Sequence, residues 1–307
     1  MVTALSKTHD VRTFSRQPPS AGLFPGTVTG LTGDVSDVND VCRAARGADV
    51  IVHLAALLHV VDPPPALRAE YERVNVGGTS AVIEAALAED VSRVVLMSTI
   101  AVYGYGTRAR FDEDSPLHPE TFYGQTKLSA ERVAIAARRH NGSPLATVLR
   151  AAAVYGPRVK GNYDRLVRAL ARRRFIPIGP GENLRTLIFD RDLASATALA
   201  ATHPAAAGRV YNVSDGTPHS LREIIAAISR ALGRRPPRWH APVAPVRLAL
   251  HAASVIDHRL PRMLEKYLEE VAVDASRIQV ELGFRPETNL VDGWRATVGE
   301  MRRTGRL

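Results

Sequence analysis

The chain has 307 residues and a formal net charge of +9, and its apolar and charged fractions lie near globular averages, which excludes a disordered or fibrous protein. Its apolar runs are too short to cross a bilayer, and its first residues lack the apolar core of a secretion signal. A single cysteine, Cys42, cannot form an internal disulfide. We therefore expect a cytoplasmic protein with no membrane partner.

The positive charge comes from arginines that are scattered along the chain. Arg172, Arg173 and Arg174 form the only run of three, and no aromatic residues alternate with them to stack on nucleic-acid bases. The pattern favours a solvated basic surface, with attraction to a phosphorylated small molecule as the alternative. No nucleic-acid partner is expected.

The first half of the chain alternates short β-branched runs with longer helical patterns. Strands are predicted at Asp10–Phe14, Val28–Gly30, Val50–Leu54, Arg93–Ser98 and Ala146–Arg150. Helices are predicted between them, at Val38–Ala45, Tyr71–Ala88 and Gly124–Arg139. Such alternation predicts βαβ units, and so a doubly wound parallel sheet of the α/β class with helices on both faces.

The composition changes after about residue 155. Proline and glycine cluster at residues 177–181 and 236–245, and helices are predicted at Arg165–Arg172, Leu221–Leu232 and Arg262–Val271. We predict a larger domain over residues 1–155. A smaller C-terminal α/β domain over residues 156–307 is expected to bind the substrate and to return some segments to the first domain.

The sharpest chemical signal is Tyr123, followed four residues later by Lys127 at the start of a predicted helix. Residues at i and i+4 share a helix face, so the Lys127 ammonium is expected to lie near the Tyr123 phenol. A nearby cation lowers the pKa of a phenol from its usual value of about 10. Abstraction of a proton from an alcohol near neutral pH requires such a lowered pKa. The spacing alone is common by chance. Upstream, however, Ser98 and Thr99 end a predicted strand, where ligands bind in open α/β sheets, so Thr99 is expected to donate to the reacting oxygen.

Further motifs follow one another along the chain. They are Gly33-Asp34-Val35, His53-Leu54-Ala55-Ala56, Asn75 within Val-Asn-Val-Gly-Gly-Thr, Val102-Tyr103-Gly104, Leu149-Arg150, Val154-Tyr155-Gly156-Pro157, Asn212-Val213 and Leu282-Gly283-Phe284-Arg285-Pro286. Together with the strand-end hydroxyls and the Tyr/Lys pair, this succession resembles the extended short-chain dehydrogenases/reductases, in particular the NAD-dependent epimerase/dehydratase branch and its UDP-glucose 4-epimerase-like members. The resemblance spans nearly the whole chain and implies that residues 1–155 form a Rossmann-like NAD(P)-binding domain.

The resemblance implies a cofactor site at the ends of the first strands. Asp34 accepts a hydrogen bond from the adenine amino group beside Val35. Leu54, Ala55 and Ala56 form a strand end small enough to let the cofactor pass.

Closer to the chemistry, the resemblance implies that Asn75 positions the active-site strand through hydrogen bonds. Ser98 borders the cofactor, with simple capping of the strand end as the alternative. Thr99 and Tyr123 form the hydroxyl pair on the substrate, and Lys127 also bonds the nicotinamide ribose.

Two features near the N-terminus bear on the cofactor. NAD-selective family members place an acidic residue at the end of the second strand. This chain has Ser15 and Arg16 there, and these residues would tolerate the 2′-phosphate of NADP. Both NAD and NADP therefore stay open as the cofactor, with NAD favoured for an epimerase. A dinucleotide fold also starts with a strand, a glycine-rich turn and a helix that hold the diphosphate. Residues Met1–Lys7 look like the end of that helix and no glycine-rich turn precedes them, so either the start is assigned too late or the turn is lost.

Arg185 matches the arginine that commonly meets the diphosphate of a nucleotide sugar in this family, and a guanidinium suits phosphate geometry. The alternative is an ion pair with Asp190 or Asp192. Metal binding is not expected, because the ten histidines do not fall at ligand spacing with carboxylates or the cysteine.

Other residues are expected to have structural roles. His53 is expected to pack at a buried strand end, and residues 112–114 to form a solvated acidic loop; His59 is expected to face the cleft without a partner. Family members often dimerise through the helix of the Tyr/Lys pair, so Leu128 and its neighbours Val133 and Ala136 serve either a homodimer interface or the core.

Several reactions are open to this family. A 4,6-dehydratase would carry an acidic pair directly after Thr99, where Ile100 and Ala101 stand, so dehydration is not expected. An NAD(P)-dependent 4-epimerase of a nucleotide sugar, which passes through a 4-keto intermediate, is the first choice. The alternatives are an NAD(P)H-dependent reductase or hydroxy-dehydrogenase of a non-nucleotide substrate, and a non-catalytic binding protein that has lost its cofactor turn.

Overall fold

The computed structural model describes residues 1–58, 64–104, 110–253 and 259–307. His59 lies outside the described residues. The main sheet consists of β3 (Val50–His53), β4 (Arg93–Thr99), β6 (Ala146–Ala151) and β10 (Val210–Val213), which are all parallel and lie in the order β10-β6-β4-β3. Non-sequential neighbours in a parallel sheet require crossovers, as the alternating pattern predicts.

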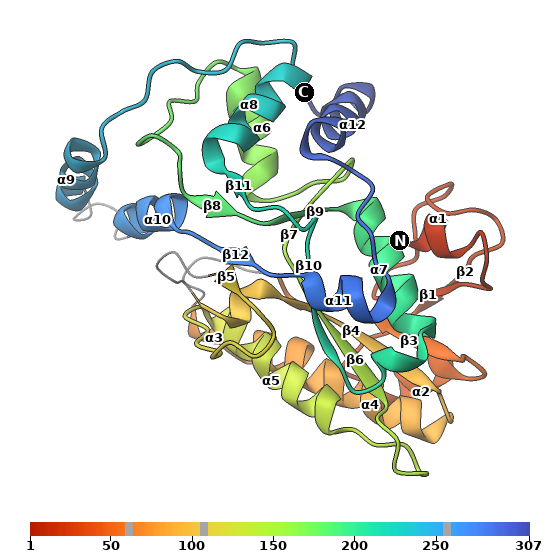
Figure 1. Ribbon diagram of the computed structural model, residues 1–307. Helices are drawn as coiled ribbons and strands as arrows, with labels where there is room; N and C mark the ends of the chain where they lie inside the picture. Colours follow the sequence, from red (N-terminus) through yellow and green to blue (C-terminus); the bar gives the residue numbers. More distant parts are fainter. Residues whose placement is uncertain (59–63, 105–109, 254–258) are drawn as a thin grey trace.

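Helices cover both faces of this sheet (Figure 1). Successive residues of β4 alternate between two cores: Val95 packs with residues of α7 (Asp190–Thr202), and Val94 packs with residues of α4 (Gly78–Ala88) and α5 (Phe122–Ala136). Because side chains alternate across a strand, a strand covered on both faces is apolar throughout. The prediction of a doubly wound α/β fold is confirmed.

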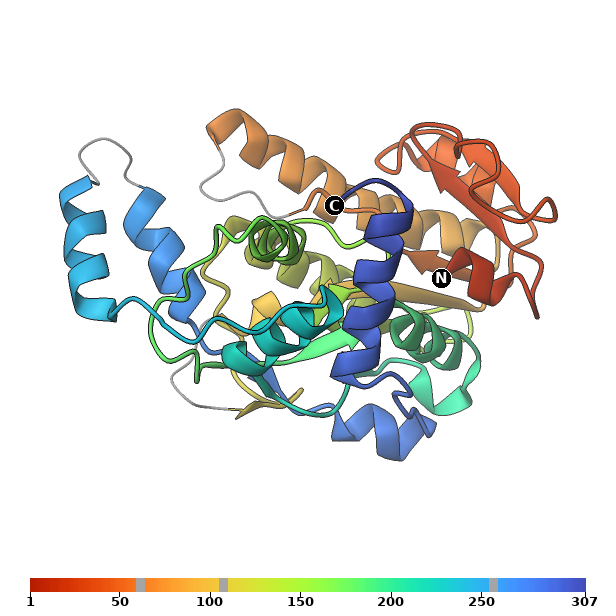
Figure 2. The same ribbon diagram turned by 90° about the horizontal axis from the view of Figure 1, so that it is seen from above.

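The N-terminal elements lie beyond the β3 edge and pack on the helices of the main sheet through α2 (Val38–Ala45), as Figures 1 and 2 show. After α1 (Val2–Leu5), strands β1 (Arg12–Ser15) and β2 (Thr29–Thr32) pair in parallel, and α2 follows at the predicted bounds. Among the described residues, β1 pairs only with β2, and β3 only with β4. In the doubly wound strand order, one further strand belongs between these two edges, at the point where the order reverses.

The predicted helix Tyr71–Ala88 is three consecutive pieces. These are α3 (Pro65–Tyr71), a π-helical turn (Glu72–Gly77) and α4. A π turn inserts one extra residue into a helix and is frequent at functional sites. It contains Asn75, which is buried and hydrogen-bonded to neighbouring elements.

The C-terminal part has its own core, and two of its elements return to the main sheet. Its elements are β5 (Arg110–Phe111), β7 (Ala153–Tyr155), α6 (Asn162–Ala171), β8 (Leu184–Arg185), β9 (Leu187–Phe189), β11 (His219–Ser220), α8 (Leu221–Ala231), α9 (Val243–Ala253), α10 (Arg259–Leu268), β12 (Ala272–Val273), α11 (Ser276–Leu282) and α12 (Leu290–Arg303). Tyr155, Phe189 and Trp294 pack at its centre. Strand β10 is part of the main sheet, and helix α7 packs against that sheet. The domain boundary at residue 155 stays a prediction.

One correction concerns this part. Helix α10 ends at Leu268, because the chain leaves it to form β12, so the predicted helix Arg262–Val271 is displaced toward the N-terminus. Across the part of the chain that the structure describes, no helix combines the length and apolar character needed to span a membrane.

Candidate active site

The predicted site residues of the first domain gather at the carboxyl ends of parallel strands. Ser15 ends β1, Asp34 follows β2, Leu54 follows β3, and Thr99 ends β4. This edge is where open α/β sheets bind their ligands. The helix that carries Tyr123 and Lys127 reaches the same edge with its N-terminus (Figure 1).

Helix α5 is held close to the end of β4. Thr121 caps its N-terminus and accepts a hydrogen bond from the Gly124 amide at 3.1 Å. A Cβ on Gly124 would meet the Ala101 carbonyl oxygen at 2.8 Å, so only glycine allows this approach. The contact fixes the first turn of α5 against the turn that follows Thr99.

Tyr123 and Thr99 are joined by a side-chain hydrogen bond. Burial raises the pKa of Tyr123 to about 12, and the neighbouring Tyr71 adds to this rise while the Thr99 hydrogen bond opposes it. The edge of the Tyr71 ring faces Tyr123 with 6.5 Å between ring centroids. The expected lowering of this pKa by Lys127 does not appear in this structure: the pKa of the phenol is raised, and burial is the largest cause.

Lys127 is buried one turn further along α5, with 3% of its surface exposed. Burial lowers the pKa of Lys127 to about 8, and the Glu131 carboxylate opposes this change. The ammonium also contributes to the pKa of His53, which burial lowers to about 3. His53 is hydrogen-bonded to Thr79 at 3.1 Å, as expected for a packed polar residue.

Glu131 belongs to a buried ion pair that sequence reasoning missed. Arg150 of β6 donates from Nη2 to Oε2 of this carboxylate at 2.8 Å and from Nε to Oε1 at 3.2 Å, and Ser98 also donates to Oε1. Ser98 and Arg150 are register partners on neighbouring strands. Ser98 therefore supports the charged residue behind Lys127, and the four-residue spacing from Lys127 is the signal that could have found Glu131.

Asn75 connects two elements of the site. Its side-chain oxygen accepts from the Leu57 amide at 2.7 Å, and its amide nitrogen donates to Thr126 of α5 at 3.1 Å. Sequence analysis expected it to position the active-site strand. In the structure its bonds reach the segment after β3 and helix α5 instead.

The residues expected near the adenine lie beside one another at the surface. Asp34 accepts from the amide and the hydroxyl of Ser36 and from Arg73 at 3.0 Å, and these bonds lower its pKa to about 2. Val35 packs closely against Gly78, because a Cβ added at position 78 would lie 2.9 Å from the Val35 side chain. A carboxylate has about four acceptor sites, so Asp34 retains capacity for one more donor.

The ends of β1 and β3 are open. Ser15 and Arg16 are exposed, and the Ser15 hydroxyl donates to the Gln17 carbonyl at 2.6 Å. Leu54 and Ala55 are exposed and Ala56 is half-buried. Strand ends with small, exposed side chains leave room for an extended cofactor. Among the described residues, no glycine-rich turn offers backbone amides to the diphosphate of such a cofactor.

Arg185 lies in the C-terminal part. Its Nη2 atom donates to the Lys266 and Tyr267 carbonyls, at 2.8 and 3.0 Å, at the end of α10. No ion pair joins it to Asp190 or Asp192 among the described residues, and Asp192 instead accepts from backbone amides near Glu287. The alternative of an ion pair with these aspartates is therefore wrong.

An acidic residue that sequence analysis did not single out faces Arg185. Burial raises the pKa of Glu269 to about 7, with the charges of Arg185 and Lys266 opposing this rise. The charge of Glu120, three residues before Tyr123, adds to the rise, so both Arg185 and Glu120 lie within electrostatic reach of Glu269.

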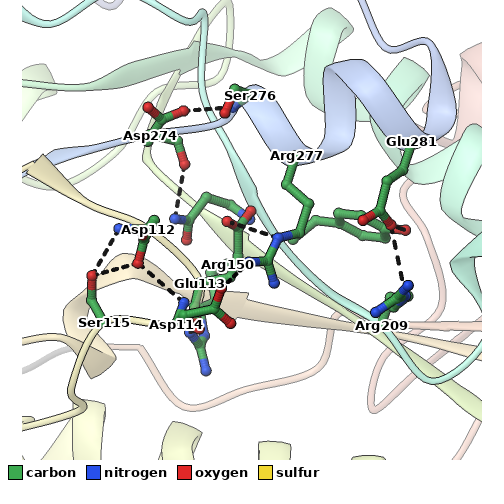
Figure 3. Close-up of polar contacts among 12 residues, drawn as sticks. Asp112, Glu113, Asp114, Ser115, Arg150, Arg209, Asp274, Ser276, Arg277 and Glu281 are labelled. Carbon is green, nitrogen blue, oxygen red and sulfur yellow. Dashed lines mark hydrogen bonds and ion pairs between the residues drawn. The ribbon is translucent and has the colours of Figure 1, made fainter.

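The acidic loop was expected to be solvated, and one of its members is buried. Glu113 accepts from the Asn212 amide at 2.8 Å and lies 3.5 Å from Arg277 of α11. Figure 3 shows Arg277 directed at Glu113 and Asp114, with Arg150 close by. The expectation was wrong for Glu113 because α11 folds back over this loop. Among the described residues, no cluster of His, Cys, Asp or Glu could hold a metal ion.

Comparison with known proteins agrees with this geometry. The family model for the NAD dependent epimerase/dehydratase family matches residues 1–214. A UDP-glucose 4-epimerase of Vibrio cholerae is 31% identical over 280 residues, which cover 87% of this chain and 82% of that protein. A dTDP-glucose 4,6-dehydratase of Streptomyces griseus is 31% identical over 269 residues, with 87% and 75% covered.

A solved structure shows the same fold over nearly the whole chain. MoeE5, in complex with UDP-glucose and NAD, superimposes with a TM-score of 0.77 and 28% identity, covering 99% of this chain and 94% of MoeE5. The order of motifs, the arrangement of the strand ends and the family match agree. The chain belongs to the NAD-dependent epimerase/dehydratase family of extended short-chain dehydrogenases/reductases.

Proposed function

We propose that this protein is an NAD-dependent 4-epimerase of a nucleotide-linked hexose. The observation that carries the proposal is the hydrogen-bonded pair Thr99–Tyr123 beside buried Lys127, at the carboxyl ends of the parallel strands. Reversible oxidation of one hydroxyl needs a group to move its proton and a donor to hold its oxygen, and this pair supplies both.

The residues at the two ends of the site fit a nicotinamide dinucleotide. Asp34 would face the adenine, and Lys127 the nicotinamide ribose. Bound NAD⁺ would supply the hydride acceptor and a positive charge. The pKa of Tyr123 is about 12 and that of Lys127 about 8, so Tyr123 is protonated in the absence of cofactor. A positive charge nearby would favour the phenolate form of Tyr123.

Once that positive charge is present, Tyr123 would release its own proton to solvent, and the resulting phenolate would take the proton of the C4 hydroxyl while Thr99 donates to its oxygen. On return of the hydride to the opposite face, Tyr123 gives the proton back. Arg185 would hold the diphosphate. Ile100 and Ala101 follow Thr99, and neither can act as the acid that a 4,6-dehydratase requires.

The test is incubation of the purified chain with UDP-glucose or UDP-N-acetylglucosamine and NAD, with the 4-epimer detected by NMR. We expect Tyr123→Phe to lower kcat by roughly 10²- to 10⁴-fold, the range of general acid–base catalysis. Tyr155→Phe, in the C-terminal core, is the matched control and should retain activity, because the Tyr155 hydroxyl has no hydrogen-bond partner among the described residues. Equal epimer formation by the Tyr123 variant would contradict the proposal.

The assay needs saturating cofactor. Because the described residues offer no glycine-rich cradle, we expect calorimetry on these 307 residues alone to show NAD binding weaker than about micromolar, well below the affinity of cradled dinucleotides. Micromolar or tighter binding would contradict this expectation.

The second candidate is an NAD(P)H-dependent reductase of a non-nucleotide substrate. The absence of an acidic residue at the end of β1, where Ser15 and Arg16 stand, favours it. Net consumption of NADPH without epimer formation would identify this activity.

We also propose that any homodimer forms through α4 and α5, as the family resemblance implies. Leu128 is buried in the core of the chain itself, Val133 is half-buried, and Ala136 is exposed. The proposal therefore rests on the outer face of α5, and sedimentation velocity tests it.

A further inference from the structure

The arginine-rich segment before α10 forms a surface that the proposed reaction does not use. Residues 224–258 contain five arginines and one acidic residue, a formal charge of +4 out of +9 for the chain. Sequence analysis treated these arginines as scattered. The structure shows that Arg235 and Arg238 are exposed on the segment between α8 and α9.

Helix α9 carries an apolar surface into solvent. Of its 11 residues, only Arg247 and His251 are polar. Leu248 is 74% exposed, and Ala244, Pro245 and Ala249 are exposed around it. Both views show α9 standing out from the body of the molecule with α10 beside it (Figures 1 and 2). Contiguous exposed apolar surface in a folded protein marks an interaction site.

An ion pair fixes α9 on its neighbour. Arg247 and Glu265 of α10 lie 3.1 Å apart. The end of α10 in turn receives the hydrogen bonds of Arg185. The apolar helix is therefore part of the ordered structure and is connected to the candidate substrate region.

An exposed tryptophan and basic hollows complete the surface. Trp239 is 64% exposed and lines a cavity of about 210 Å³ together with Arg222 and Arg238. A second cavity, of about 470 Å³, is lined by Arg173 and Arg235 among others. Guanidinium groups suit phosphate oxygens, and these hollows fit phosphate headgroups.

We propose that this α9 surface, comprising Arg235, Arg238, Trp239, Arg247 and Leu248, binds the surface of an anionic lipid bilayer. An apolar helix, an interfacial indole and a cluster of cations are the three elements of such contacts. Helix α9 would be roughly 16 Å long, about half of the hydrocarbon thickness, so it lies in the interface and does not span it.

The charge distribution argues against two other occupants. A second copy would place Arg235 and Arg238 of one chain against the same two arginines of the other, which opposes self-association through this face. A nucleic acid would satisfy the arginines but leave α9 uncovered, and one tryptophan is a poor stacking platform. The proposal is independent of the epimerase function.

The experiment is flotation of the full chain with vesicles of phosphatidylcholine alone or mixed with phosphatidylglycerol. The chain has two tryptophans, and Trp294 is fully buried, so changes in emission report Trp239. We expect binding to the anionic vesicles only, with a blue shift, protection from acrylamide and loss of binding at high salt. Lack of binding to anionic vesicles would overturn the proposal.

Variants separate this surface from net charge. Arg235→Glu with Arg238→Glu should weaken vesicle binding by at least about tenfold. Arg46→Glu with Arg303→Glu, at side chains 78% and 74% exposed elsewhere, changes the net charge equally and should not weaken it. An equal loss in both double variants would mean unspecific attraction and would overturn the proposal.

The apolar contribution is tested in the same way. Leu248→Asp should abolish the blue shift of Trp239, whereas Val280→Asp, at an 83% exposed position of α11, should retain it. Circular dichroism checks that each variant is folded. Preferential binding of duplex DNA, or a dimer in sedimentation that Leu248→Asp dissociates, would contradict the lipid assignment.

Discussion

At the scale of single residues, burial decides the chemistry of the Tyr/Lys pair. The spacing of Tyr123 and Lys127 correctly places both groups at one end of the sheet. Their protonation depends on how much solvent the fold removes, and here the pKa of Tyr123 rises while that of Lys127 falls. Each group is pushed toward its neutral form, and Glu131 is the neighbour that keeps Lys127 charged.

Replacement of that neighbour should change the pH dependence of activity. The ammonium is lost as pH rises through its pKa, so we expect kcat to fall above about pH 8, where the pKa of Lys127 lies. Glu131→Gln removes the opposing carboxylate, so the pKa of Lys127 should fall further and the alkaline limb should move to lower pH. A pH–rate profile measures this shift.

Controls distinguish charge from structure. Glu131→Asp should return the alkaline fall in kcat to nearly its original pH. Glu84→Gln, at an exposed position of α4, should leave the pH of that fall unchanged. If Glu131→Gln lowers kcat equally at every pH, the carboxylate has a purely structural role.

At the scale of elements, the site depends on how closely α5 approaches β4. Gly124 lies in the first turn of α5 against the Ala101 carbonyl, and this contact holds Tyr123 beside Thr99. The sequence predicts the helix but not the distance of its approach, because helical periodicity carries no information on neighbouring elements.

A methyl group at this position should displace the helix. Gly124→Ala would bring its Cβ to 2.8 Å from the Ala101 oxygen, so we expect a lower Tm and a fall in kcat of about tenfold or more, as misplaced catalytic groups cause. Thermal unfolding and initial rates measure the two effects.

The same change elsewhere should act in the opposite direction. Gly299 lies on an exposed face of α12, where a Cβ would meet nothing within 4 Å. Gly299→Ala should stabilise the protein by about 0.5–1 kcal/mol through helix propensity and leave kcat unchanged. Equal effects of the two substitutions would show that the close approach is unimportant.

At the scale of the whole molecule, a buried polar network joins the sheet to the C-terminal segments. Arg150 binds Glu131 on one side and the Tyr103 hydroxyl at 2.9 Å on the other, and Tyr103 donates to Asn212 of β10 at 2.8 Å. Asn212 continues the network to Glu113 and, through it, to Arg277 of α11 (Figure 3).

The centre of this network should dominate its contribution to stability. Arg150→Met leaves the Glu131 carboxylate buried without its partner, so we expect a loss of roughly 3–5 kcal/mol in the free energy of unfolding. The double variant Arg150→Met with Glu131→Leu should recover much of that loss. Arg303→Ala, which breaks the exposed pair with Glu300, should leave the free energy of unfolding nearly unchanged, because solvent screens this pair. Urea unfolding measures all three, and a small loss for Arg150→Met alone would contradict the central role.

The sequence by itself determined the α/β class, the parallel sheet, the strand-end hydroxyls and the Tyr123/Lys127 pair, because these follow from local periodicity and from motifs in a fixed order. The tertiary structure alone decided the π-helical turn around Asn75, the burial of Glu113, and the partners of Arg185. It also decided that β1 and β3 are separate edges and that α9 faces solvent. Each of these depends on which distant segments come together and how much water they exclude, and pairwise contacts of that kind leave no periodic trace in the chain.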